Sequence, residues 1–204
     1  MGSLKLPHAS GNSMSIAAPA TNPASDLELK LPATIGTAGQ VLKNSSTPGT
    51  LEFGTAATNT PAFAVRPSSD QAADSNNVWY KVEWDTEDFD TDNAFDNTND
   101  KFVVPAGAGG VYQLNVQVSV TNQSESAEMD LRVYKNGSAL TTPRAMLDYS
   151  GGSGNFTNVV NHSYLYDLNA TDYLEIYIWH GSGGTNVIES DYTAWSMFKL
   201  AGTS

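Results

Sequence analysis

The clearest pattern in the sequence is strict alternation of apolar and polar residues over short segments. Residues 111–120, VYQLNVQVSV, place Tyr112, Leu114 and every second residue as far as Val120 on one face. Alternation with a period of two is typical of a half-buried antiparallel strand. Strand-like segments with Asn, Gly and Pro between them also occupy residues 129–135, 158–168, 173–180 and 192–200. The sequence therefore predicts an all-β domain.

Turn-forming residues separate these segments. Asn136-Gly137 directly follows residues 129–135 and favours a tight turn, because both residue types tolerate positive φ. Residues 169–172, Asn-Ala-Thr-Asp, form a polar turn between two aromatic-rich strands. No segment shows an apolar stripe with a period of 3.6 over ten residues, so we predict no long helix.

The pattern changes near residue 61. Before it, Phe53 is the one aromatic residue, and Gly, Pro and Asn interrupt the chain repeatedly. Such a segment cannot build a core alone. We therefore predict an extended arm of short strands over residues 1–60, with a floppy linker as the alternative, and one domain over residues 61–204. The apolar residues expected to attach the arm to other proteins are Leu4, Leu6, Leu27, Leu29, Leu31, Val41 and Leu42.

Charge and cysteine content exclude several classes of function. The net charge is -12 and the 22 acidic residues outnumber ten Lys and Arg, which opposes binding to nucleic acid or to anionic membranes. The chain has no Cys, so disulfides and thiolate metal sites are absent. No apolar run is long enough to insert into a membrane, and the first 20 residues lack a signal-peptide pattern. We expect the mature chain to start near Met1.

One strand is apolar on both faces. In residues 173–179, YLEIYIW, the side chains of Leu174, Ile176 and Ile178 can fill the inner face of a sandwich. The aromatic side chains on the other face would then be exposed to water unless another surface buried them, and neighbouring subunits of an oligomer could supply that surface. The predicted interface residues, including two from the preceding strand, are Tyr164, Tyr166, Tyr173, Tyr177 and Trp179.

The order of these elements resembles the C1q and tumour necrosis factor superfamily. Residues 61–65 match its opening strand, residues 102–112 its Phe-x-x-Pro-x-x-Gly-x-Tyr region, and residues 195–200 its closing strand. Residues 133–137, VYKNG, resemble its Lys-Asn-Gly hairpin. The resemblance implies a ten-stranded jelly-roll sandwich that assembles as a homotrimer. The collagen-like stalk of complement proteins is absent, so their immune role is not implied.

The arm has a resemblance of its own. Residues 31–42, LPATIGTAGQVL, followed by GTLEFG at residues 49–54, are similar to a short segment that precedes terminal domains in tail-fibre and other structural proteins of bacteriophages. This implies that residues 1–60 bind other virion structural proteins. A chain without Cys and without a signal peptide agrees with synthesis in a bacterial cytoplasm.

The densest charge run lies between Glu83 and Asp100, with no cation among its residues. Its Asp88-x-Asp90-x-Asp92 spacing matches the first ligands of a calcium loop, but Asn93 replaces the expected Gly and Asn99 the bidentate Glu, which excludes an EF-hand. A looser Ca²⁺ site formed by Asp88, Asp90 and Asp92 remains an alternative to a solvated acidic loop. No other cofactor is indicated, and no nucleophile or metal motif points to an enzyme.

Together these features predict a structural protein of a bacteriophage virion. It would be a trimeric short fibre or a decoration of tail or capsid, anchored by its arm and presenting a knob that contacts a host glycan or protein. Location on head or tail stays open. A secreted C1q-like recognition lectin is the alternative, if a signal peptide had been removed, and a small polysaccharide depolymerase is the third reading.

Overall fold

A computed structural model describes residues 3–7, 11, 13–17, 20–21, 23, 28–56, 59–123, 128–148, 156–181 and 185–202. The chain forms two compact units, Met1–Thr58 and Asn59–Ser204. In the described part, no helix is long and apolar enough to cross a membrane. The regular elements there are strands and one short 3-10 turn, η1 (Ser190–Tyr192).

The N-terminal unit contains two separate two-stranded antiparallel sheets. They are β1 (Ser3–Pro7) with β2 (Ser13–Ala17), and β3 (Gln40–Asn44) with β4 (Leu51–Thr55). An isolated parallel bridge between Lys30 and Thr50 adds one more backbone pairing. Two-stranded sheets bury little apolar surface by themselves. The described side chains of this unit accordingly stay largely exposed.

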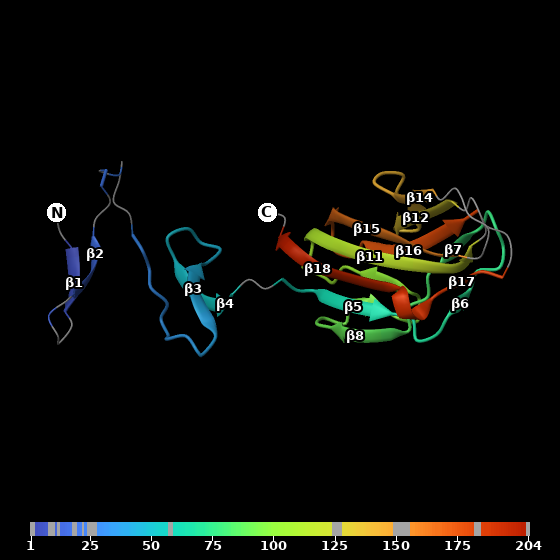
Figure 1. Cartoon of the computed structure of the whole chain (residues 1–204). Helices are drawn as coiled ribbons and strands as arrows, with labels where there is room; N and C mark the ends of the chain where they lie inside the picture. The colour runs from blue at the N-terminus through green and yellow to red at the C-terminus, as the bar shows by residue number, and fades with distance from the viewer. Residues whose placement is uncertain are drawn as a thin grey trace. The chain divides into compact units, whose positions relative to one another are not determined.

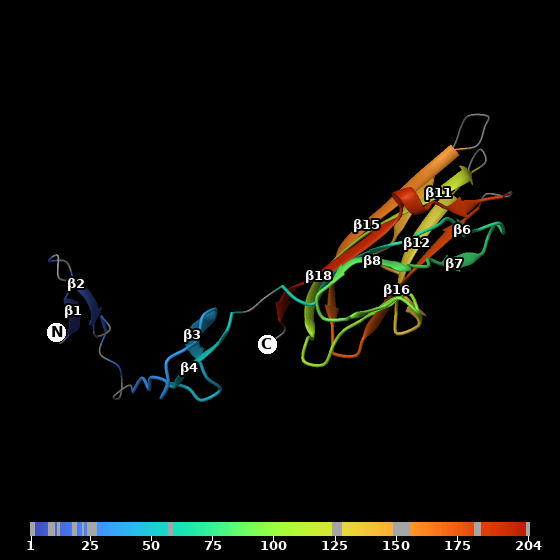
Figure 2. The ribbon, with the colours of Figure 1, turned by 90° about the horizontal axis from the view of Figure 1, so that it is seen from below.

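The C-terminal unit is a sandwich of two antiparallel sheets (Figures 1 and 2). The first, called the β11 sheet here, has the order β6-β17-β11-β18-β5-β8. Both β17 and β18 pair with one edge of β11, and β15 pairs with its other edge. Its strands are β5 (Ala62–Arg66), β6 (Gln71–Ala72), β8 (Thr86–Asp90), β11 (Gly110–Gln123), β15 (Phe156–Leu168), β17 (Val187–Ile188) and β18 (Ala194–Gly202).

The second sheet, called the β16 sheet, has the order β13-β12-β16-β10-β9, with β14 pairing β12 and β7 pairing β16. Its strands are β7 (Trp79–Lys81), β9 (Phe95–Asp96), β10 (Lys101–Val103), β12 (Glu128–Lys135), β13 (Ser138–Ala139), β14 (Ala145–Asp148) and β16 (Tyr173–His180). Each sheet has seven strands. Without the four strands of two residues, ten remain, as the predicted jelly roll requires.

Strand alternation places the core between the two sheets. The predicted inner positions of β11, Tyr112 and Leu114 among them, are fully buried, and so are Leu174, Ile176 and Ile178 of β16. These predictions are confirmed. Both sheets therefore turn their apolar face inward, as the period of two requires.

Aromatic rings join the sheets in the centre of the core. Phe63 on β5 stacks on Phe102 of β10 with ring centroids 5.2 Å apart. Trp195 on β18 meets Phe63 and Phe95 edge to face, at 5.1 and 5.5 Å. Such pairs add to the free energy gained from burial alone, by about 0.5–1.5 kcal/mol each. The packing of β5 and β18 against β9 and β10 thus holds the two sheets together.

Two turns far apart in sequence are fastened together at one end of the sandwich. Asn136 and Gly137 have φ values of 52° and 76°, which confirms the predicted tight turn. Asp172, from the predicted polar turn, accepts hydrogen bonds from the side chains of Lys135 (2.7 Å) and Asn136 (2.7 Å) and from the Asn169 backbone N–H (2.8 Å). The turn over residues 169–172 carries the chain from the β11 sheet to the β16 sheet.

Candidate functional site

The outer face of the β11 sheet is uncharged along its central strands. Cross-strand pairing aligns its outward residues in rows, because residues directly opposite one another point to the same side. In the middle of the face none of these side chains is charged, although the whole chain carries a net charge of -12. The members are Ala62, Ala64, Phe89, Gln113, Asn115, Gln117, Asn161, Ser163, Leu165, Ala194, Ser196 and Phe198. We call this surface the uncharged face. Charged outward residues lie at its margin, with Asp167 opposite Val111 and Arg66 at the end of β5.

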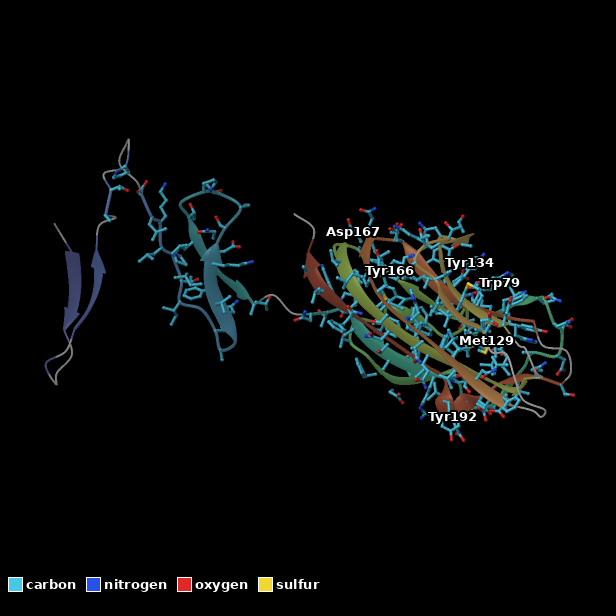
Figure 3. The ribbon with its side chains drawn as sticks, turned by 45° about the horizontal axis from the view of Figure 1, so that its top comes forward. Trp79, Met129, Tyr134, Tyr166, Asp167 and Tyr192 are labelled. Atoms are coloured by element: carbon cyan, nitrogen blue, oxygen red, sulfur yellow. The ribbon has the colours of Figure 1, made fainter. Side chains whose placement is uncertain are left out.

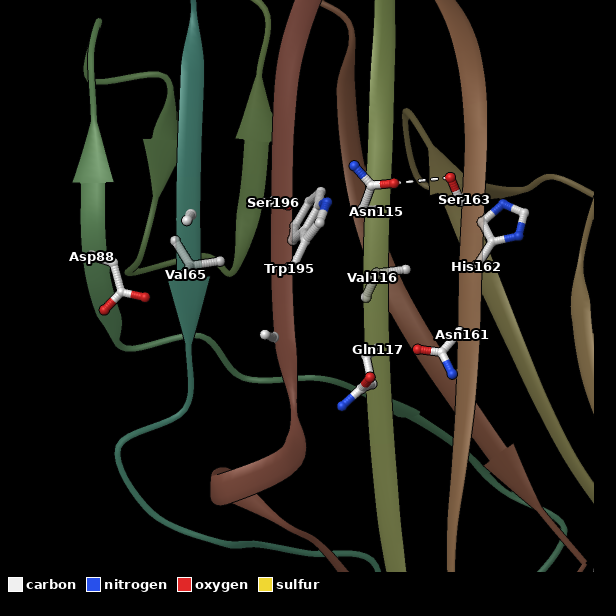
Figure 4. Close-up of a pocket in the computed structure, with 12 residues that line it drawn as sticks. Val65, Asp88, Asn115, Val116, Gln117, Asn161, His162, Ser163, Trp195 and Ser196 are labelled. Carbon is white, nitrogen blue, oxygen red and sulfur yellow. Dashed lines mark hydrogen bonds between the residues drawn. The ribbon is translucent and has the colours of Figure 1, made fainter.

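A hollow of about 440 Å³ lies along the middle of the uncharged face, lined by β5, β8, β11, β15 and β18 (Figure 4). Its polar groups are partly satisfied within the sheet. Ser163 donates to the Oδ1 of Asn115 over 2.9 Å and accepts from the amide of Gln113 over 2.9 Å. At the rim Asp88 pairs with Arg66 at 3.0 Å. The floor is therefore neutral and hydrogen-bonded, which suits close approach by another protein surface.

The outer face of the β16 sheet is built differently, because here charges are present and are paired. Asp130 on β12 receives Arg132 Nη2 at 2.9 Å and Arg144 Nη1 at 3.0 Å, both on its Oδ2. Lys81 on β7 pairs with Glu175 on β16 at 2.6 Å. Sequence reasoning missed the Asp130 cluster, since Asp130 lies on β12, Arg144 lies just before β14, and no motif spaces them.

The aromatic residues predicted at a subunit interface divide between the two sheets. Tyr164 and Tyr166 lie on β15 of the β11 sheet, on the same side of the strand as Val160 and Leu168. Tyr166 is buried, whereas Tyr164 is 46% exposed. Tyr173, Tyr177 and Trp179 lie on the outer side of β16. The five predicted interface residues therefore do not form one surface, because the turn between the strands crosses from sheet to sheet. Figure 3 labels Tyr166 on β15 and Tyr134 and Trp79 on the other sheet.

Tyr173, Tyr177 and Trp179 are half-buried within the single chain. The ring of Tyr177 packs on that of Tyr134 at 4.1 Å, and Lys101 lies 5.0 Å from the ring centre of Tyr173. Neighbouring side chains thus already cover part of the surface that the sequence suggested a second subunit would cover. A role of these residues in subunit contacts stays a prediction.

His162 and Tyr166 form a buried polar pair on the inner side of β15, with 2.8 Å between the imidazole Nε2 and the hydroxyl oxygen. Burial lowers the pKa of His162 and raises the pKa of Tyr166, because both charged forms are poorly solvated there. Both groups are therefore neutral at pH 7. The pair satisfies two polar groups in the core and has a structural role.

The acidic run is held by turn hydrogen bonds. Asp90 accepts from the backbone N–H of Asp92 and Phe95, at 3.2 and 2.8 Å, while Asp88 binds Arg66. Among the described residues no group of three or more His, Cys, Asp and Glu could hold a metal ion. Asp88, Asp90 and Asp92 are not brought together as a Ca²⁺ site would require.

Three more acidic residues of the run, Asp85, Asp96 and Asp100, accept hydrogen bonds from backbone N–H groups. Hydrogen bonds from the Ser68 side chain lower the pKa of Asp85, and those from the Asn99 side chain lower the pKa of Asp96. Desolvation raises the pKa of Asp100, which accepts from the Trp84 N–H at 2.7 Å. Charge repulsion within the run is offset locally by donors, an arrangement that residue spacing alone does not reveal.

The residues predicted to attach the arm are exposed where the structure describes their side chains. Leu29 is 63% exposed, Leu31 71%, Val41 42% and Leu42 49%. Leu4 and Leu6 pair within β1 and β2, but their side chains lie outside the described residues, as does Leu27 entirely. Nothing within the described N-terminal unit covers the exposed four.

No family model and no curated protein matches this chain. Solved structures do. A crystal structure of murine APRIL at pH 5.0 aligns with a TM-score of 0.51 and 16% identity, covering 68% of this chain and 98% of that one. The globular domain of zebrafish complement 1qA protein gives a TM-score of 0.48 at 18% identity, covering 71% and 100%. Eiger TNF from S. frugiperda gives 0.49 at 15%, covering 70% and 94%.

The all-β sandwich and the alignment with APRIL define the fold as a C1q/TNF-like jelly roll. At 16% identity the likeness concerns the fold alone. Function has to be argued from the two outer faces and the N-terminal unit.

Proposed function

We propose that this protein is a structural protein of a bacteriophage virion, a trimeric short fibre or a decoration of tail or capsid. The N-terminal arm anchors it to other virion proteins, and the jelly roll forms a knob that contacts the host. The observation that carries the proposal is the division of the chain into a knob with its own core and an N-terminal unit with exposed apolar side chains. The similarity of residues 31–54 to phage attachment segments supports the same assignment.

The arm is suited to binding because its apolar side chains gain most from being covered. Ile35 is 93% exposed, and Leu29 and Leu31 are each more than half exposed. Burial of one such side chain is worth about 1.5–3 kcal/mol. Several of them against a virion protein would therefore give a stable attachment.

The knob is suited to self-association through the uncharged face. Like charges brought together at an interface cost several kcal/mol, so an acidic chain associates with copies of itself where charge is absent. The uncharged face spans β15, β11, β18 and β5 and offers a hollow for a neighbour's side chains. A cyclic trimer lets each copy present this face to the next and closes without an open end.

Deletion of residues 1–58 tests the arm. The shortened chain should still fold and form trimers, because the core residues all belong to the second unit, but it should no longer join virions. Circular dichroism, light scattering and the protein content of purified particles measure the three properties. Leu31→Asp should reduce incorporation, whereas Thr34→Asp, an exposed polar control, should not. Normal incorporation of the deletion variant would refute attachment through the arm.

The C1q-like fold also agrees with a secreted recognition lectin. That reading differs in mass, since secretion from a eukaryotic cell would add glycans at Asn-x-Ser/Thr sites. Mass spectrometry of the native protein separates the two: an unmodified chain in purified virions supports the fibre, and glycan mass supports the lectin.

A further inference from the structure

A second hollow, of about 260 Å³, lies on the outer face of the β16 sheet. Four strands each contribute one residue to a single cross-strand row at this point. The row is Met146 on β14, Asp130 on β12, Trp179 on β16 and Trp79 on β7. Glu128, Arg132 and Arg144 complete the lining. The volume lies below the roughly 300–1,000 Å³ of sites for drug-sized ligands, so the hollow suits one small ring.

Asp130 is the polar centre of this hollow. Only 6% of the residue is exposed, and both arginines donate to its Oδ2. Its Oδ1 and the Nε of Arg132 are buried, and neither has a hydrogen-bond partner among the described residues. A buried acceptor and a buried donor are each costly unless something supplies the missing bonds. A hydroxyl group can do so, because it donates and accepts at once.

The rest of the lining restricts the chemistry of the ligand. Asp130 and Glu128 carry two negative charges, and Arg132 and Arg144 carry two positive charges, so the lining has no net charge. The guanidinium of Arg132 lies 4.5 Å from the ring centre of Trp79, which holds the indole in place. Indole rings present broad flat apolar surfaces, and they pack well against the C–H face of a sugar ring. Fixed donors, a carboxylate and two indoles together fit a neutral polyhydroxylated ring.

We propose that this hollow binds one neutral pyranose unit of a glycan. The ring packs against Trp79 and Trp179, and its hydroxyls donate to Asp130 and accept from Arg132 and Arg144. The inference rests on the proposed function of the knob as a binding domain and specifies the class of its ligand. It also requires the outer face of β16 to remain open in the trimer, which subunit contacts through the uncharged face allow.

Saturation-transfer NMR on the full-length protein tests the site directly. The probes are methyl glycosides of glucose, galactose, mannose and N-acetylglucosamine, with methyl glucuronide as the acidic comparison. At least one neutral glycoside should receive magnetisation at its ring protons. Trp79→Ala should weaken that signal at least tenfold, and Arg144→Met, which leaves the pair of Asp130 and Arg132 in place, should weaken it severalfold. Tyr192→Ala removes an exposed ring outside the hollow and should change nothing.

Three outcomes would overturn the inference: no signal with any neutral glycoside, binding of the glucuronide alone, or equal signals from Trp79→Ala and the unmodified protein. Incorporation of Trp79→Ala into virions is measured in parallel. The virion role predicts normal incorporation whatever the NMR result, so the two proposals can fail separately. Arg144 is partly exposed and its loss should leave the fold intact, which keeps the test valid if Trp79→Ala does not fold.

Discussion

The two outer faces of the jelly roll limit charge repulsion in opposite ways. The uncharged face of the β11 sheet has no charged residue in its middle, where four neighbouring strands meet, and keeps charge to its margin. The β16 sheet keeps charges on its outer face and neutralises them in pairs, such as Lys81 with Glu175 and Asp130 with two arginines. Exclusion leaves a neutral, hollowed surface suited to another copy. Pairing leaves fixed donors and acceptors suited to a small polar ligand.

The largest expected effect is a charge placed in the middle of the uncharged face. Ser196→Arg should convert trimers to monomers, because three-fold repetition brings an unpaired guanidinium to every copy of the interface. Ser196→Ala is the matched control and should remain trimeric. Light scattering and sedimentation measure the assembly, and circular dichroism checks the fold.

Tyr177→Arg introduces the corresponding charge on the outer face of the β16 sheet, where the sequence analysis predicts subunit contacts. We expect this variant to stay trimeric, since the pair of Tyr177 and Tyr134 lies away from the uncharged face. Monomers from Tyr177→Arg together with trimers from Ser196→Arg would reverse the roles of the two faces.

Removal of the shared carboxylate should have the next largest effect. Asp130→Ala leaves Arg132 and Arg144 facing each other with no anion between them, and we expect a loss of about 2 kcal/mol in the free energy of unfolding, moderated by the partial exposure of both arginines. Asp148→Ala, an exposed acid on the adjacent strand, should change stability by less than about 0.5 kcal/mol. Urea titration measures both, and equal values would show that the pairing contributes nothing.

Acid should weaken the end of the sandwich where the two turns meet. Partial burial alone would raise the pKa of Asp172, but the hydrogen bonds from Lys135 and Asn136 lower it below the ordinary value of 3.8. A lowered folded-state pKa contributes stability that is fully present above 3.8 and is lost as the pH falls through the folded value. Asp172→Asn should lower stability by about 1–2 kcal/mol at pH 7 and reduce the loss below pH 4. Thermal melts between pH 2 and 7 would contradict this if the variant and the parent chain lost stability equally.

The smallest effect is expected from chelation. Asp88 and Asp90 are already bound to Arg66 and to backbone N–H groups, so excess EDTA should leave the melting temperature unchanged. A ligand bound only to the folded state would add about 2.7 kcal/mol at a hundredfold excess over its dissociation constant. A clear downward shift of the melting temperature would therefore support the Ca²⁺ site predicted from the spacing of Asp88, Asp90 and Asp92.

The sequence by itself determined the strands and their inner faces. The alternation in β11 and β16 indicated which residues are buried, and Asn136-Gly137 indicated a turn, because both signals depend on neighbours one or two residues away. These local patterns were enough for the all-β class and for the separation of arm from knob as a hypothesis. The jelly roll was implied by the resemblance to the C1q and tumour necrosis factor superfamily.

Only the tertiary structure decided which strands lie side by side. β15 and β16 are neighbours in sequence but belong to different sheets, which divides the predicted aromatic row. The uncharged face gathers strands from residues 62 to 202, and Asp130 on β12 meets Arg144 from the loop before β14. Strand pairing over such separations depends on the packing of the whole core, and no local periodicity encodes it.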